Sequence, residues 1–148
     1  MSQHFVRDIE TTIARVSRSF SVIVLTGPRQ VGKTTAFMDQ QDAKRHCVTL
    51  DDLTERRLAK TDPRMFLQLH PAPVLIDEVQ YAPELFPYIK MAVDRGAPPG
   101  SFWLTGSQAF RMMALAQESL AGRAAILQMT TLSQHEIFGQ GRAEAFSL

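Results

Sequence analysis

One stretch of the sequence restricts the possible folds more than any other, and it reads Gly27-Pro28-Arg29-Gln30-Val31-Gly32-Lys33-Thr34. Two glycines separated by four residues are followed directly by a lysine and a hydroxyl residue. A loop bent through glycines can turn successive backbone N–H groups around an anion, which side chains would obstruct. A helix beginning near Gly32 adds its positive end, Lys33 can reach the outer phosphates, and Thr34 can ligate Mg²⁺. The stretch therefore predicts a phosphate-binding loop between a strand and a helix.

The sequence around this loop alternates between strand and helix patterns. A run of aliphatic residues at 21–26 predicts a strand buried on both faces. Further strands are expected at 47–50, 74–76, 101–105 and 124–129, and helices at 5–20, after Gly32, at 52–60, at 63–69, from Pro83 onward and at 108–118. Such alternation is typical of a three-layer α/β fold, with a parallel sheet and helices on both faces. We expect one domain spanning residues 1–148.

Composition narrows the class of protein further. The 148 residues are 45% hydrophobic and 21% charged, and the net charge of +1 gives no global attraction for nucleic acid or acidic lipid. Nucleic-acid binding stays open only through Arg7, Arg15 and Arg18 on the first helix. No apolar run approaches membrane-spanning length, so no membrane contact is expected. The single cysteine, Cys47, is expected to be a buried thiol, which favours a reducing, cytoplasmic location.

A pair of carboxylates, Asp77 and Glu78, follows the predicted strand at 74–76. Ligands of parallel sheets bind at this end of the strands. We expect Asp77 to hold Mg²⁺, usually through water, and Glu78 to orient or deprotonate the water that attacks a γ-phosphate. Such a pair alone also fits a solvated strand end or a helix cap. Beside the phosphate loop it favours hydrolysis over kinase chemistry, because a kinase must exclude reactive water.

Adenine is the expected base. The chain contains no asparagine, so the Asn-Lys-x-Asp signature that reads guanine in many GTPases is excluded. The residues expected to hold ATP are Gly27, Pro28, Arg29, Gln30, Val31, Gly32, Lys33, Thr34 and Thr35. Arg29 either touches phosphate or is solvated. The expected catalytic set is Lys33, Glu78, Ser107 and Arg123, and the expected metal ligands are Thr34 and Asp77.

Two of the catalytic candidates have open alternatives. Ser107 follows the fourth predicted strand, where it could contact the γ-phosphate or the attacking water. Thr105 or Gln108 could fill that role, and Ser107 could instead cap the next helix. Arg123 either projects into the site of a neighbouring subunit as an arginine finger or is a surface arginine. Asp51 and Asp52 could assist the metal, although capping of the following helix is expected.

Taken together, these blocks resemble the AAA-type ATPase cores at the N-terminus of a large group of bacterial and archaeal ATP-binding proteins. The resemblance rests on residues 25–35, 50–52, 75–80, 83–86, 104–107 and 119–123. It implies a five-stranded parallel sheet with the phosphate-loop strand in the centre, and assembly as a homo-oligomer through Arg123. Members of this group usually continue into a second domain, so the resemblance implies a core without its C-terminal lid or effector domain. The alternative to an active ATPase is a nucleotide-binding switch with negligible turnover, controlled by that domain or a partner protein.

Overall fold

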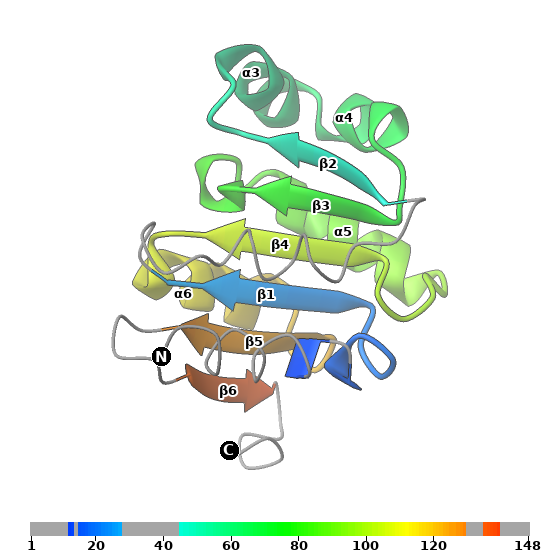
Figure 1. Ribbon diagram of the computed structural model, residues 1–148. Coiled ribbons are helices and arrows are strands. Elements are labelled where there is room, and N and C mark those ends of the chain that lie inside the picture. The colour runs from blue at the N-terminus through cyan, green and yellow to red at the C-terminus, as the bar shows by residue number, and fades with distance from the viewer. Residues whose placement is uncertain (1–11, 14, 28–44, 130–134, 140–148) are drawn as a thin grey trace.

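The computed structural model describes residues 12–13, 15–27, 45–129 and 135–139. A six-stranded sheet runs through it in the order β2-β3-β4-β1-β5-β6 (Figure 1). The strands are β1 (Val22–Thr26), β2 (His46–Thr49), β3 (Val74–Asp77), β4 (Phe102–Gly106), β5 (Ala124–Met129) and β6 (His135–Gly139). The first five are parallel, as predicted, and β1 lies in the interior between β4 and β5. The sixth strand, antiparallel to β5, was not predicted.

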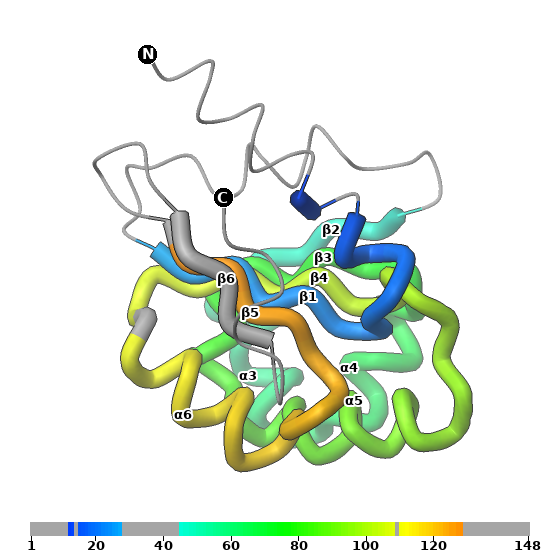
Figure 2. Tube along the Cα trace, turned by 90° about the horizontal axis from the view of Figure 1, so that it is seen from below, coloured from blue at the N-terminus to red at the C-terminus, as the bar shows by residue number. Residues whose placement is uncertain are grey.

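Helices cover both faces of the sheet. The elements α3 (Leu53–Thr61), α4 (Pro63–Leu69), α5 (Leu85–Asp94) and α6 (Ala109–Ser119) lie together on one face (Figure 2). Helical residues at 12–13 and 15–16 pack on the opposite face through Ile13 and Val16. The predicted three-layer α/β arrangement is therefore confirmed. No helix within the described ranges has the length and apolar character needed to span a bilayer.

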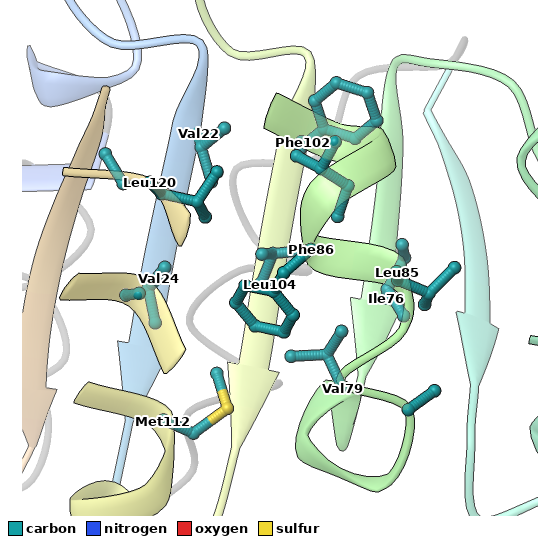
Figure 3. Close-up of a cluster of buried hydrophobic side chains, with 14 of the residues drawn as sticks. Val22, Val24, Ile76, Val79, Leu85, Phe86, Phe102, Leu104, Met112 and Leu120 are labelled. Carbon is teal, nitrogen blue, oxygen red and sulfur yellow. The ribbon is translucent and has the colours of Figure 1, made fainter. Parts of the chain in front are cut away.

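The alternation of side chains along β1 divides the core in two. Val22 and Val24 belong to a cluster that packs beneath α5 and α6, whereas Ile23 and Leu25 face the other way, toward Ile13. Because a buried parallel strand has apolar contacts on both faces, all five residues of β1 are buried. The larger cluster includes Phe86 of α5, which is fully buried against the sheet (Figure 3). Two apolar layers thus hold β1 in place.

Some local predictions need correction. Cys47 is exposed rather than buried, because β2 is the last described strand on its side of the sheet and residue 47 points away from the larger apolar cluster. The helix expected from Pro83 begins at Leu85. The structure also contains a short 3-10 helix, η2 (Val79–Tyr81), that had not been predicted.

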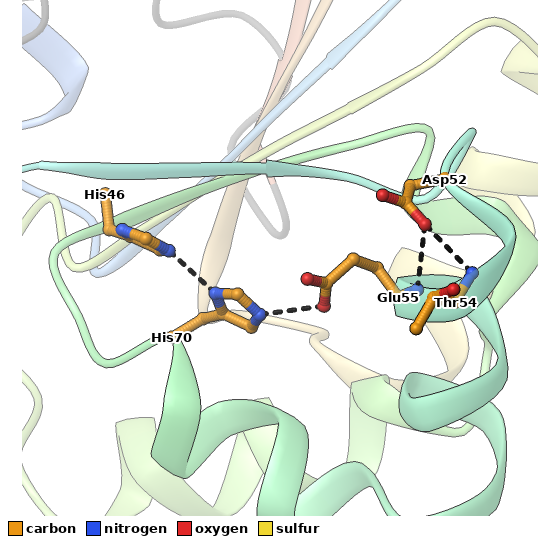
Figure 4. Close-up of polar contacts among 5 residues, drawn as sticks. All are labelled: His46, Asp52, Thr54, Glu55 and His70. Atoms are coloured by element: carbon orange, nitrogen blue, oxygen red, sulfur yellow. Dashed lines mark hydrogen bonds and ion pairs between the residues drawn. The ribbon is translucent and has the colours of Figure 1, made fainter.

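Two aspartates fix the helices that follow β2. The Asp52 carboxylate accepts hydrogen bonds from the backbone N–H groups of Thr54 and Glu55 at 2.9 and 3.3 Å, which confirms the predicted capping of α3 (Figure 4). Asp62 caps α4 through the N–H of Met65. At the same corner, Nδ1 of His70, the residue that ends α4, lies 2.7 Å from Nε2 of His46 on β2, and its Nε2 lies 2.9 Å from Oε1 of Glu55 on α3 (Figure 4). These contacts link β2, α3 and α4.

Candidate active site

The start of the glycine-rich stretch lies at the carboxyl edge of the parallel strands. Gly27 follows β1 directly, and its N–H donates a hydrogen bond of 3.2 Å to the carbonyl of Gly106 at the end of β4. The loop therefore leaves the sheet beside the end of β4, which itself neighbours β3. Residues 28–44, including Lys33 and Thr34, lie outside the described residues, so their contacts with phosphate and metal stay predictions.

Asp77 joins three strands through its carboxylate. Its Oδ2 accepts a hydrogen bond of 2.8 Å from Thr49 at the end of β2, and its Oδ1 accepts one of 2.5 Å from Thr105 of β4. Residues two apart on a strand share a face, so Asp77 lies on the face of Leu75 and Thr105 on that of Trp103. Asp77 is half-buried at the end of β3, and its role as a metal ligand stays a prediction.

Glu78 has a different environment, although it is adjacent in sequence. Its backbone has φ 55° and ψ 46°, the left-handed region, which ends β3 and begins η2. The side chain is only 2% exposed. Three hydrogen bonds converge on its Oε1, from Gln80 Nε2 at 2.7 Å, Ser107 Oγ at 2.9 Å and Ser107 N at 3.3 Å. The turn thus directs this carboxylate toward the end of β4.

Two hydroxyl residues at the end of β4, Thr105 within the strand and Ser107 just after it, are divided between the two carboxylates. Thr105 binds Asp77, and Ser107 binds Glu78. The alternative that Ser107 caps α6 is wrong, because the N-cap position of α6 is occupied by Gln108, whose side chain is exposed and makes no capping hydrogen bond. The structure therefore brings Ser107 together with Glu78, and a contact between Ser107 and nucleotide stays a prediction.

Gln80 is a residue of this site that the sequence analysis did not select. It is 1% exposed, its side-chain amide donates to Glu78, and its backbone carbonyl accepts a hydrogen bond from Arg111 Nε of α6 at 3.3 Å. A glutamine two residues after a strand-end carboxylate carries no special signal in one sequence. Only the 3-10 turn, which returns residue 80 toward residue 78, makes the contact evident.

Arg123 lies at the other end of the sheet. It directly precedes β5, at the amino edge of the parallel strands, whereas Asp77 and Glu78 are at the carboxyl edge. Its Nε donates to Asp94 of α5 at 2.7 Å, and its Nη1 donates to the carbonyl of Ala121 at 2.9 Å. The hydrogen bond from Arg123 holds the pKa of the Asp94 carboxyl below its ordinary value. Within one chain, Arg123 is thus a partly exposed member of an ion pair, and an intersubunit role stays a prediction.

A groove of about 440 Å³ lies between α4 and α5. It is lined by Arg64, Leu67, Gln68, Tyr88, Met91, Ala92 and Arg95. None of these residues belongs to the hydrogen-bond network around Asp77 and Glu78. The groove has no carboxylate in its lining, so the carboxyl edge of the sheet, where Asp77 and Glu78 lie, is the better candidate site for a nucleotide.

Comparisons of the sequence identify a family and two relatives of this chain. A family model described as an AAA domain matches residues 19–138. An uncharacterized protein of Mycobacterium bovis and one of Mycobacterium tuberculosis are each 35% identical to the chain over 134 residues. The match covers 88% of this chain and 30% of each relative, so the chain spans less than a third of their length. With a parallel sheet and a phosphate-loop sequence after β1, the chain belongs to the AAA-domain family of nucleotide-binding, ATPase-like P-loop domains.

Proposed function

We propose that this domain binds ATP with Mg²⁺ and hydrolyses it at the carboxyl edge of the sheet. One observation carries the proposal: two adjacent carboxylates are held in different environments beside the start of the glycine-rich stretch. Asp77 is half-buried between two hydroxyl groups, and Glu78 is buried under an amide and a third hydroxyl. Metal binding and water activation call for two carboxylates with such separate surroundings.

The residues at this edge suit Mg²⁺. Magnesium prefers oxygen ligands, keeps several waters, and is usually held by one or two carboxylates together with substrate phosphates. Within the described ranges no three His, Cys, Asp or Glu side chains gather as a metal site. Asp77 would hold the ion with Thr34, phosphate oxygens and water as the other ligands. When bound, Mg²⁺ would neutralise charge on the phosphates.

Each remaining residue has a separate task in this proposal. Lys33 and the backbone of the glycine-rich stretch hold the phosphates. The Glu78 carboxylate orients the attacking water and accepts its proton, while Ser107 stands beside it. Water has to be placed in line with the phosphorus atom, so a carboxylate fixed by several donors suits this task better than a freely rotating one.

Phosphate release from MgATP tests the proposal. We expect turnover in the wild type, turnover reduced to a small residual rate with nucleotide binding retained in Glu78→Gln, and weakened binding together with lost turnover in Lys33→Ala. Gln117→Met, a substitution at an exposed position of α6, is the control and should match the wild type. A Lys33→Ala variant that turns over at the wild-type rate would refute the proposed site.

A switch with negligible turnover is the second candidate, and one observation favours it. Oε1 of Glu78 already accepts three hydrogen bonds within the chain, so the carboxylate has to reorganise before it can accept a proton through that oxygen. Tight binding of ATP without phosphate release, in the wild type as in Glu78→Gln, would identify this function. The effector that a switch controls would be a further domain or a partner protein.

Assembly through Arg123 is a separate part of the proposal. An arginine finger acting across subunits would have to exchange Asp94 for the nucleotide of a neighbour. Turnover per subunit would then rise with protein concentration, and Arg123→Ala would abolish the rise. A rate per subunit that is independent of concentration, and equal in the two proteins, would exclude this role.

A further inference from the structure

We infer that Gln80 is a positioning residue for Glu78, holding the carboxylate where it can act on water. The inference rests on the proposed function of Glu78. Its evidence is a hydrogen bond of 2.7 Å between Gln80 Nε2 and Glu78 Oε1, formed between two side chains that are 1% and 2% exposed. A charge-assisted hydrogen bond in such surroundings is stronger than one in water.

The orientation of the Gln80 amide follows from chemistry. An ionised carboxylate can only accept hydrogen bonds, so the NH₂ end of the amide must face Glu78. The other end, Oε1, is then buried and has no hydrogen-bond partner within the described part of the chain. A buried carbonyl without a partner costs free energy that an apolar side chain of similar volume would avoid. We therefore assign the role of Gln80 to its NH₂ group, which donates to Glu78.

The surroundings of Gln80 leave its side chain little room to move. A Cβ atom on Gly106 would lie 2.5 Å from Gln80 Oε1 and 2.7 Å from Met112 Cγ, so the amide is packed closely against the end of β4. The backbone of residue 80 is tied to Arg111 of α6. Glu78 is thereby held from two elements at once, by Gln80 from η2 and by Ser107 from the end of β4.

The contact itself can be tested without turnover. In the nucleotide-free wild type, the side-chain NH₂ resonances of Gln80 should be protected from hydrogen exchange. They should shift in Glu78→Gln, whose neutral amide replaces the charged acceptor. The NH₂ resonances of Gln117, which is exposed on α6, are the control and should be unaffected. Gln80 resonances that are unprotected and indifferent to Glu78→Gln would overturn the inference, whatever the activity of the protein.

A kinetic cycle tests what the contact does. Gln80→Met keeps the approximate volume and removes the donor, so kcat should fall by about tenfold or more while the affinity for ATP stays within about twofold. Adding Gln80→Met to Glu78→Gln should not lower the residual rate further, because a residue that acts through Glu78 has no effect once that carboxylate is gone. Thermal unfolding of each variant, with Gln117→Met alongside, separates lost positioning from lost structure.

The outcomes are distinguishable. If Gln80→Met retains the wild-type kcat while Glu78→Gln lowers turnover to a small residual rate, the proposed hydrolysis stands and the positioning role is wrong. If Gln80→Met slows the reaction equally in both backgrounds, its effect does not pass through Glu78, and the inference fails. A wild type without turnover refutes the proposed function, and the NMR measurement then decides whether Gln80 holds Glu78.

Discussion

The left-handed backbone of Glu78 leads to a prediction about stability that contacts alone would not give. With φ 55° and ψ 46°, Glu78 is the single residue other than glycine with positive φ among those described. Glu78→Ala and Glu78→Gly remove the same carboxylate and the same hydrogen bonds. The difference in unfolding free energy between these two variants therefore isolates the backbone at this position.

The expected difference follows from two opposing terms. A residue with a Cβ atom is disfavoured in the left-handed region by about 1–2 kcal/mol, which glycine avoids. Glycine loses more backbone entropy on folding, which costs about 0.4–1 kcal/mol relative to alanine. The first term is the larger, so Glu78→Gly should be more stable than Glu78→Ala by about 0.5–1 kcal/mol.

Urea unfolding of both variants, without nucleotide, measures this difference. Lys90, exposed in the middle of α5, gives the matched control, and there alanine should exceed glycine by about 1 kcal/mol because the backbone is helical. Neither variant at position 78 should release phosphate from ATP. If the alanine variant is more stable than the glycine variant at position 78 as well as at position 90, the reasoning about the turn after β3 is wrong.

Two further predictions concern the core and the ion pair of α5. Phe86→Ala should lower the free energy of unfolding by about 3–5 kcal/mol, because Phe86 is fully buried. Phe110→Ala, at a position 92% exposed, is the control and should stay within about 0.5 kcal/mol of the wild type. Equal losses of unfolding free energy in the two variants, measured by urea unfolding, would contradict the packing of Phe86. Arg123→Ala should raise the pKa of Asp94 in an NMR titration toward the ordinary 3.8. Since the pKa of Asp94 is lowered in the folded wild type, the ion pair stabilises the fold fully above pH 3.8, and this stabilisation is lost as the pH falls through the lowered pKa. A difference in unfolding free energy between the wild type and Arg123→Ala that persists unchanged in stronger acid would refute this role of the pair.

The parts of the fold that sequence could predict are those set by local pattern. Five strands were predicted because each is a short apolar run, and their parallel direction was predicted from the helix patterns that alternate with them in the sequence. The capping role of Asp52 follows from its place before a helix. By contrast, β6 pairs with β5, and that long-range pairing could not be read from the short segment at 135–139 itself.

The site could be predicted as a set of residues and not as a network. Parallel strands end at one edge, so Asp77, Glu78 and Ser107 were expected to gather there. Which hydroxyl serves which carboxylate depends on the turn at Glu78, and a glutamate gives no signal for a left-handed backbone, as a glycine or asparagine would. The contact of Gln80 depends on the same turn, and so it could not be foreseen.

The hydrogen bonds to Asp77 mechanically connect the ends of β2, β3 and β4. The hydroxyls of Thr49 on β2 and Thr105 on β4 donate hydrogen bonds to different oxygens of the Asp77 carboxylate, so Asp77 links the ends of three strands. Any ligand that pulls on this carboxylate also pulls on Thr49, and only Leu50 and Asp51 separate Thr49 from the cap of α3. A displacement of the Asp77 carboxylate would therefore be transmitted to the corner of β2, α3 and α4 through these hydrogen bonds and a few peptide units.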